Sequence, residues 1–202
     1  YNYSGATIQA GTTYTIEALG ASTVTIDNAG TISAGTTDAI SCVSCAGVTL
    51  TNSGNITAGT TNAVRLDSVS GTNTITNSGT ISAVGSRAIR ITSATGVTIT
   101  NEAGGTISSD GLIGIDAENA FSPTIRNYGT ISAARISGIG INLSHNPTLG
   151  PIGSGATITN TGTIELSGDN SDGITLGDST GVYNDATITN SGTISSGDNS
   201  IW

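Results

Sequence analysis

A nine-residue motif that returns along the whole chain constrains the fold most strongly. It reads Thr-Ile-Thr-Asn-Ser-Gly-Thr-Ile-Ser at residues 74–82, and near-copies occupy residues 25–33 and 49–57. Further copies place an asparagine at the same point of every repeat, at intervals of 24, 25, 24, 26, 33 and 30 residues. These asparagines are Asn28, Asn52, Asn77, Asn101, Asn127, Asn160 and Asn190. Self-similarity at such a period predicts a solenoid in which each repeat forms one coil.

The motif also predicts the local structure of each coil. Thr-Ile-Thr alternates polar and apolar residues with the period of a strand, so isoleucine faces inward and both threonines face outward. Asn-Ser-Gly ends this strand because glycine accepts a positive φ and asparagine tolerates the left-handed conformation. Thr-Ile-Ser then begins a second strand. A third strand is expected at residues 63–66, 88–91, 140–143 and 173–176. Three short strands per coil predict an all-β parallel β-helix of about seven to eight coils.

Stacking of the coils would place equivalent residues above one another at the normal spacing between strands. The first predicted interior column contains Ile26, Leu50, Ile75, Ile99, Ile125, Ile158 and Ile188. The second contains Ile32, Ile56, Ile81, Ile107, Ile131, Ile164 and Ile194. At the corner between the two strands, each repeated asparagine is expected to turn inward and to bond to the asparagine of the next coil, forming an Asn ladder.

Repeated Ile-Thr-Asn-Ser-Gly-Thr-Ile followed by Ala-Ile resembles the passenger region of bacterial autotransporter proteins. The resemblance covers the chain from about Thr23 to Ile201. It implies a right-handed parallel β-helix that is displayed on, or released from, the outer membrane, and therefore an extracellular or outer-membrane surface location. The motif is specific for the fold rather than the function, since passengers include adhesins, enzymes and structural stalks.

Composition narrows the range of partners. Only 9% of the 202 residues are charged, the chain has no lysine, and its formal net charge is −9. This balance argues against nucleic acid as a partner, because phosphate binding needs clustered Lys and Arg. It also argues against attraction to an anionic membrane surface. No run of 18 apolar residues is present, so we expect no insertion of this segment into a membrane.

The unbroken repeat indicates one domain, residues 1–202. A degenerate copy of the corner at residues 2–8 indicates that the sequence begins in the middle of a coil, and it also ends in the middle of one, after a third strand. We expect either a part of a longer solenoid or processed passenger, or a subunit that stacks end to end through its open strand edges.

Cys42 and Cys45 form a Cys-x-x-Cys sequence. Without a second pair or a βαβ pattern, a zinc site and a redox motif are both disfavoured. We expect a short structural disulfide of an oxidising compartment, with a small entropic contribution because the loop that it closes is short.

An insertion at about residues 144–153 lengthens one coil and contains the single histidine. Insertions in a solenoid project as loops from one face, so His145, Asn146 and Pro147 form a possible binding loop. We do not expect His145 to be a catalytic base, because no nucleophile or orienting carboxylate accompanies it.

Three aspartates near the carboxyl end suggest a possible calcium site. Asp169 and Asp198 are 29 residues apart, about one coil, and Asp172 lies close in sequence. Stacked carboxylates repel one another, and a hard cation with oxygen ligands would relieve this repulsion. The alternative is a solvated acidic edge; otherwise the sequence implies no cofactor.

Outward positions of the third strand predict a polar column. It reads Ser41, Arg65, Arg90, Asp116, Asn142 and Thr175. Arg65 is expected to stack on Arg90, and Arg90 on Asp116, on a solvated face; a small anionic-ligand patch is the alternative.

These features favour a secreted or cell-surface structural and adhesive β-helix without catalysis, whose partners are surface glycans, proteins or copies of itself. A self-assembling filament is the alternative. A polysaccharide-cleaving enzyme is disfavoured because Asp110, Asp116 and Glu118 have no evident partners for paired-carboxylate chemistry.

Ice binding is a further alternative, suggested by Thr-x-Thr pairs on one face, although Asp27 and Arg126 interrupt one of the two ranks. The pairs are Thr23/Thr25, Thr49/Thr51, Thr74/Thr76, Thr98/Thr100, Thr157/Thr159 and Thr187/Thr189.

Overall fold

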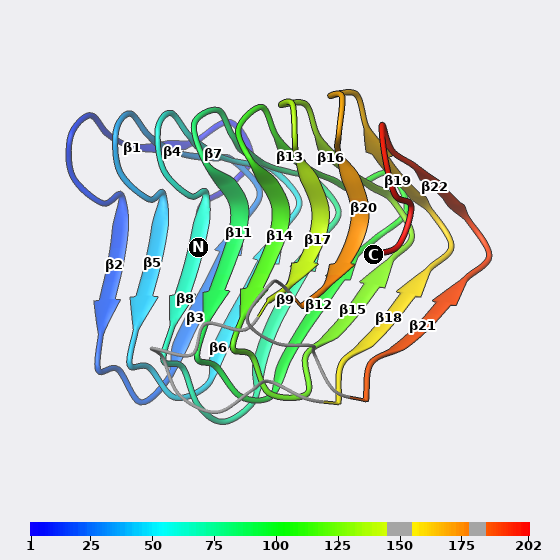
Figure 1. The fold of residues 1–202 in the computed structure, drawn as a ribbon. Coiled ribbons are helices and arrows are strands. Elements are labelled where there is room, and N and C mark those ends of the chain that lie inside the picture. The colour runs from blue at the N-terminus through cyan, green and yellow to red at the C-terminus, as the bar shows by residue number, and fades with distance from the viewer. Residues whose placement is uncertain (145–154, 178–184) are drawn as a thin grey trace.

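The computed structural model describes residues 1–144, 155–177 and 185–202. In these residues the chain winds through three parallel β-sheets that run along one axis, so that each coil contributes one strand to each sheet (Figure 1). Sequence neighbours lie in different sheets, whereas strands one repeat apart are hydrogen-bonded. This is the predicted right-handed parallel β-helix, with eight strands in one sheet and seven in each of the others.

Sheet A collects the first strand of each repeat. Its members are β3 (Val24–Asn28), β6 (Val48–Asn52), β9 (Asn73–Asn77), β12 (Val97–Asn101), β15 (Thr124–Asn127), β18 (Thr157–Asn160) and β21 (Thr187–Asn190). Sheet B collects the second strand. Its members are β1 (Thr7–Ala10), β4 (Thr31–Ala34), β7 (Asn55–Ala58), β10 (Thr80–Ala83), β13 (Thr106–Ser109), β16 (Thr130–Ala133), β19 (Thr163–Leu166) and β22 (Thr193–Ser195).

Sheet C collects the third strand and is the front sheet of Figure 1. Its members are β2 (Ile16–Leu19), β5 (Ile40–Val43), β8 (Val64–Asp67), β11 (Arg87–Thr92), β14 (Ile113–Glu118), β17 (Ile139–Leu143) and β20 (Asp172–Leu176).

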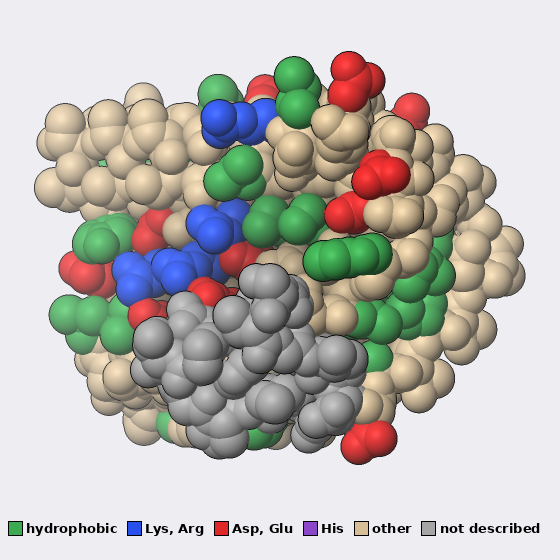
Figure 2. All heavy atoms as spheres, in the orientation of Figure 1, with side chains coloured by type: hydrophobic (Ala, Val, Ile, Leu, Met, Phe, Trp, Pro, Cys, Tyr) green, Lys and Arg blue, Asp and Glu red, His purple; other side chains and the backbone are tan. Residues whose placement is uncertain are grey.

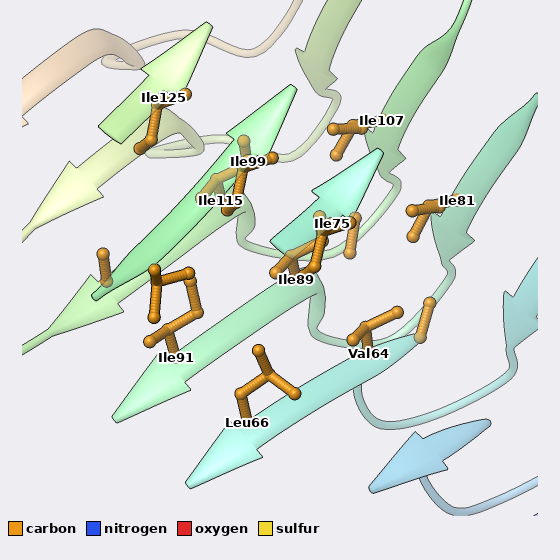
Figure 3. Packing of buried hydrophobic residues seen from close by; sticks show 14 of the residues in the cluster. Val64, Leu66, Ile75, Ile81, Ile89, Ile91, Ile99, Ile107, Ile115 and Ile125 are labelled. Atoms are coloured by element: carbon orange, nitrogen blue, oxygen red, sulfur yellow. The ribbon is translucent and has the colours of Figure 1, made fainter. Parts of the chain in front are cut away.

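The interior columns predicted from the motif are confirmed by the strand register. Ile75 pairs with Leu50 on one side and with Ile99 on the other, and Ile81 pairs with Ile56 and Ile107 in the same way. Figure 3 shows Ile75, Ile81, Ile99 and Ile107 directed into the space enclosed by the sheets, together with residues of sheet C. Because each strand supplies few inward residues, aliphatic side chains suffice to fill the narrow core of the described residues.

The Asn ladder is also confirmed, and it begins one coil earlier than predicted. Asn2 donates from Nδ2 to Oδ1 of Asn28 at 2.8 Å, and every later asparagine repeats this bond, ending with Asn160 to Asn190 at 2.8 Å. Asn77, which is fully buried, shows the full pattern. Its Nδ2 donates to Asn101 Oδ1 and to two backbone carbonyls, and its Oδ1 accepts from Asn52. Each corner thus satisfies the polar groups that it buries.

Two kinds of tight turn close the coils. After the ladder asparagine, a glycine is required because a Cβ at Gly79 would overlap the carbonyl oxygen of Gly54 in the preceding coil. After sheet C, the residues Ser44, Ser68 and Ser93 stack in the left-handed region with φ of 54°, 53° and 50°. Small polar residues adopt this conformation more readily than branched ones. Among the described residues, no helix has the length and hydropathy needed to cross a bilayer.

Candidate functional site

Seven charged side chains gather on the outer face of sheet C. Figure 2 shows arginine and acidic side chains interleaved over this sheet. We call this group the charged strip; it consists of Asp38, Arg65, Asp67, Arg87, Arg90, Asp116 and Glu118. Three of the five arginines of the chain therefore lie in two adjacent coils.

Arg65 links two coils at one end of the strip. Its guanidinium donates to Asp67 at 2.7 Å on its own strand and lies 3.9 Å from Asp38 in the preceding coil. Burial lowers the pKa of Arg65, but the hydrogen bond and charge of Asp67, with the charge of Asp38, raise it further than burial lowers it. Arg65 therefore stays charged, and its charge is neutralised locally.

Arg87 and Arg90 pair with acids in the next coil, but not as predicted. Arg90 lies opposite Asp116 in the register, yet its guanidinium reaches Glu118 at 3.3 Å, and it is Arg87 that donates to Asp116. The predicted stacking of Arg90 on Asp116 is confirmed by the register, but the ion pair is made with Glu118, because a long arginine side chain reaches diagonally across the ladder.

Asp116 is the most deeply buried acid of the strip, with only 2% of its surface exposed. One of its oxygens accepts from Arg87 and the other from Asn142, at 2.8 Å. Burial raises the pKa of Asp116 more than the charge of Arg87 and these hydrogen bonds lower it. Both oxygens are occupied, so this carboxyl is not presented to solvent as a free base or nucleophile.

Four residues of this face were missed from the sequence, namely Asp38, Asn62, Asp67 and Arg87, and the first two link adjacent coils. Asp38 Oδ1 accepts from both the backbone nitrogen and Nδ2 of Asn62, one coil further on. The same arrangement returns when Asp172 Oδ1 accepts from both nitrogens of Asn199. The repeat interval between Asp38 and Asn62 is the signal that could have revealed this pair.

The predicted calcium site is not assembled. Within the part of the chain that the structure describes, no three His, Cys, Asp or Glu side chains form a group that could hold a metal. In the last coil the backbone nitrogen of Asp198 donates to the carbonyl oxygen of Ser171, and Asp172 Oδ1 accepts from Asn199. The three carboxylates therefore do not converge.

Cys42 and Cys45 are free thiols in the structure, and both are completely buried. As predicted, Cys42 occupies an interior position opposite Leu66. The disulfide between the two cysteines stays a prediction. His145, Asn146 and Pro147, the possible binding loop, lie outside the described residues.

The outer face of sheet A carries the hydroxyl ranks that were expected. Thr25 heads one rank in register; the members are Thr25, Thr49, Thr74, Thr98, Thr124, Thr157 and Thr187. The parallel rank is interrupted at Asp27 and Arg126, and Thr23 precedes the strand and belongs to neither rank. The ice-binding alternative stays a prediction, for which thermal hysteresis is the test.

The fold and the charged strip together define a class: a parallel β-helix domain with one ion-paired face and two hydroxyl-bearing faces. A family model described as the BigA third pectate lyase-like domain matches residues 1–201, and the chain belongs to this family. BigA is an autotransporter-like surface protein, and domains of this kind come from bacterial surface proteins. Neither the curated proteins nor the solved structures include a significant match.

Proposed function

We propose that this chain is a non-catalytic, structural and adhesive β-helix, part of an autotransporter-type passenger displayed at the bacterial surface. The single observation that carries the proposal is the state of the charged strip, in which every carboxylate is engaged by an arginine or an asparagine: Asp67 by Arg65 of its own strand, and the others from a neighbouring coil. Family membership supports the surface location.

The charged strip argues against cleavage of a polysaccharide. Glycoside hydrolysis needs one carboxyl group to protonate the leaving group and a second one free to act on the sugar or on water. Asp116 and Glu118 lie on one strand, but Arg87 and Asn142 occupy the first, and Arg90 pairs with the second. The arginines are neutralised in the same contacts, so none is presented as a free base.

The adhesive part of the proposal rests on the outer faces of sheets A and B. In-register hydroxyl groups recur there at every coil, for example from Thr74 to Thr98 in sheet A and from Ser82 to Ser108 in sheet B. Hydroxyl groups donate and accept hydrogen bonds without adding charge, and they suit glycans or polar protein surfaces.

Two measurements test the proposal. Incubation with a panel of plant and bacterial polysaccharides, including polygalacturonate with and without Ca²⁺, should release neither reducing ends nor unsaturated products. Product formation that Asp116→Asn abolishes would establish an enzyme instead.

Binding to immobilised glycans and to intact host cells should be saturable. It should weaken in Thr76→Glu/Thr100→Glu on sheet A or in Ser82→Glu/Ser108→Glu on sheet B. The matched control is Asp67→Ala, which alters sheet C; equal loss in all three variants would contradict binding through a hydroxyl face. Electron microscopy of the same preparations tests the filament alternative.

A further inference from the structure

The two cysteines lie on either side of the turn that ends β5. Cys42 is in an interior column, between Ala18 and Leu66 of the adjacent coils. Ser44 has a φ of 54°, and after this left-handed residue the side chain of Cys45 is again in the core. Both cysteines have an exposed fraction of 0%, so no reagent in solution contacts either thiol while the coil is folded.

The contacts of the two thiols make them unreactive in the folded chain. Cys45 Sγ donates to the carbonyl oxygens of Ala18 at 3.4 Å and of Val43 at 3.6 Å. Burial, together with the charge of Cys45 and a hydrogen bond between the two thiols, raises the pKa of Cys42 to about 12. Because the thiolate is the species that attacks a disulfide, the raised pKa disfavours attack by Cys42, and burial denies a disulfide in solution access to either thiol.

We propose that Cys42 and Cys45 close a disulfide only while their coil is unfolded, and that folding then fixes whichever oxidation state the pair has reached. In the folded coil the two thiols are neighbours, so a disulfide formed before folding fits the turn with only a small movement of the two side chains. The bond would be inaccessible to reductants once β8 covers β5 from the next coil.

The chemistry is thiol–disulfide exchange with a small disulfide such as oxidised glutathione. In the unfolded chain, the thiolate of one cysteine attacks a sulfur of glutathione disulfide and expels one glutathione thiolate. The thiolate of the second cysteine then attacks the mixed disulfide and expels the second. The pair loses two protons and two electrons, and one glutathione disulfide becomes two glutathione thiols.

The test compares one oxidant on two states of the full chain. The reduced chain is exposed to oxidised glutathione either folded or in concentrated urea, and free thiols are counted by alkylation and mass spectrometry. We expect the unfolded chain to form the intramolecular disulfide. The folded chain should react at least about a hundredfold more slowly, at a rate set by local opening of the coil. After refolding, the oxidised chain should resist a water-soluble phosphine that reduces it in urea.

Two results would overturn the proposal: oxidation of the folded chain at the rate of the unfolded one, or formation of only mixed or intermolecular disulfides in urea. The double variant Cys42→Ala/Cys45→Ala controls for folding. Alanine already occupies the column of Cys42 at Ala18 and Ala117, so the core accepts it there. Cys45→Ser tests the geometry directly, since it should stop at the mixed glutathione disulfide in urea and should not react when folded.

Discussion

Removal of one rung from the middle of the Asn ladder tests the energetic account of this fold most directly. Asn77→Ala deletes three hydrogen bonds donated by Nδ2, of 3.1, 2.9 and 3.1 Å, and one of 2.8 Å accepted by Oδ1. It also leaves the buried Oδ1 of Asn101 without the donor that it has in the intact ladder.

The expected cost follows from these contacts. A hydrogen bond within a protein contributes about 0.5–1.5 kcal/mol net, and a buried acceptor left without a partner costs about 1–3 kcal/mol. Asn77 has an exposed fraction of 0%, so water does not replace the lost partners. We therefore expect Asn77→Ala to lower the free energy of unfolding by about 4 kcal/mol.

The matched control is the last rung. Asn190 is exposed and accepts a single ladder bond from Asn160, so Asn190→Ala should cost about 1 kcal/mol or less.

Guanidinium denaturation followed by circular dichroism measures both variants. Because a solenoid can open coil by coil, amide hydrogen exchange should place the weakening in the coils on either side of residue 77. A change below about 1 kcal/mol in Asn77→Ala, or equal changes in the two variants, would refute the view that the ladder stabilises the stack.

Three further outcomes are expected. Gly79→Ala should prevent folding or lower the melting temperature sharply, since its Cβ would overlap backbone of the preceding coil, whereas Gly11→Ala, with no atom nearby, should not. Arg87→Met should cost about 3 kcal/mol by leaving Asp116 buried without its cation, and the exposed Arg126→Met about 0–1 kcal/mol; denaturant titration of both measures the difference. Because burial raises the pKa of Asp116 above its ordinary 3.8, the folded chain binds this proton more tightly than the unfolded chain. The stability that protonated Asp116 contributes is therefore lost as the pH rises through its raised pKa. In Asp116→Asn, a plot of melting temperature against pH should be flatter over this range.

The sequence by itself determined the coil. The alternation around Ile75 and the glycine after Asn77 specify a strand, a corner and a second strand, and their repetition specifies which residues stack. Such local patterns suffice because each coil contacts mainly its neighbours, so the fold follows from one repeat and its period. Interior columns and ladder were predictable for this reason, whereas the first rung, at Asn2, was missed because it lies in a less regular copy of the motif.

The tertiary structure decided what the outer face of sheet C does. From the sequence, Arg90 was expected to stack on Asp116, and it does, but which acid a guanidinium reaches depends on the length and direction of the side chain. In the described residues, the three aspartates of the predicted calcium site likewise do not form a group that could hold a metal. Inward side chains have one arrangement because the core is closely packed. An outward charged side chain, by contrast, can form an ion pair with any of several groups at similar distance. A period in the sequence therefore fixes the interior, and only the assembled coils show which charges are paired.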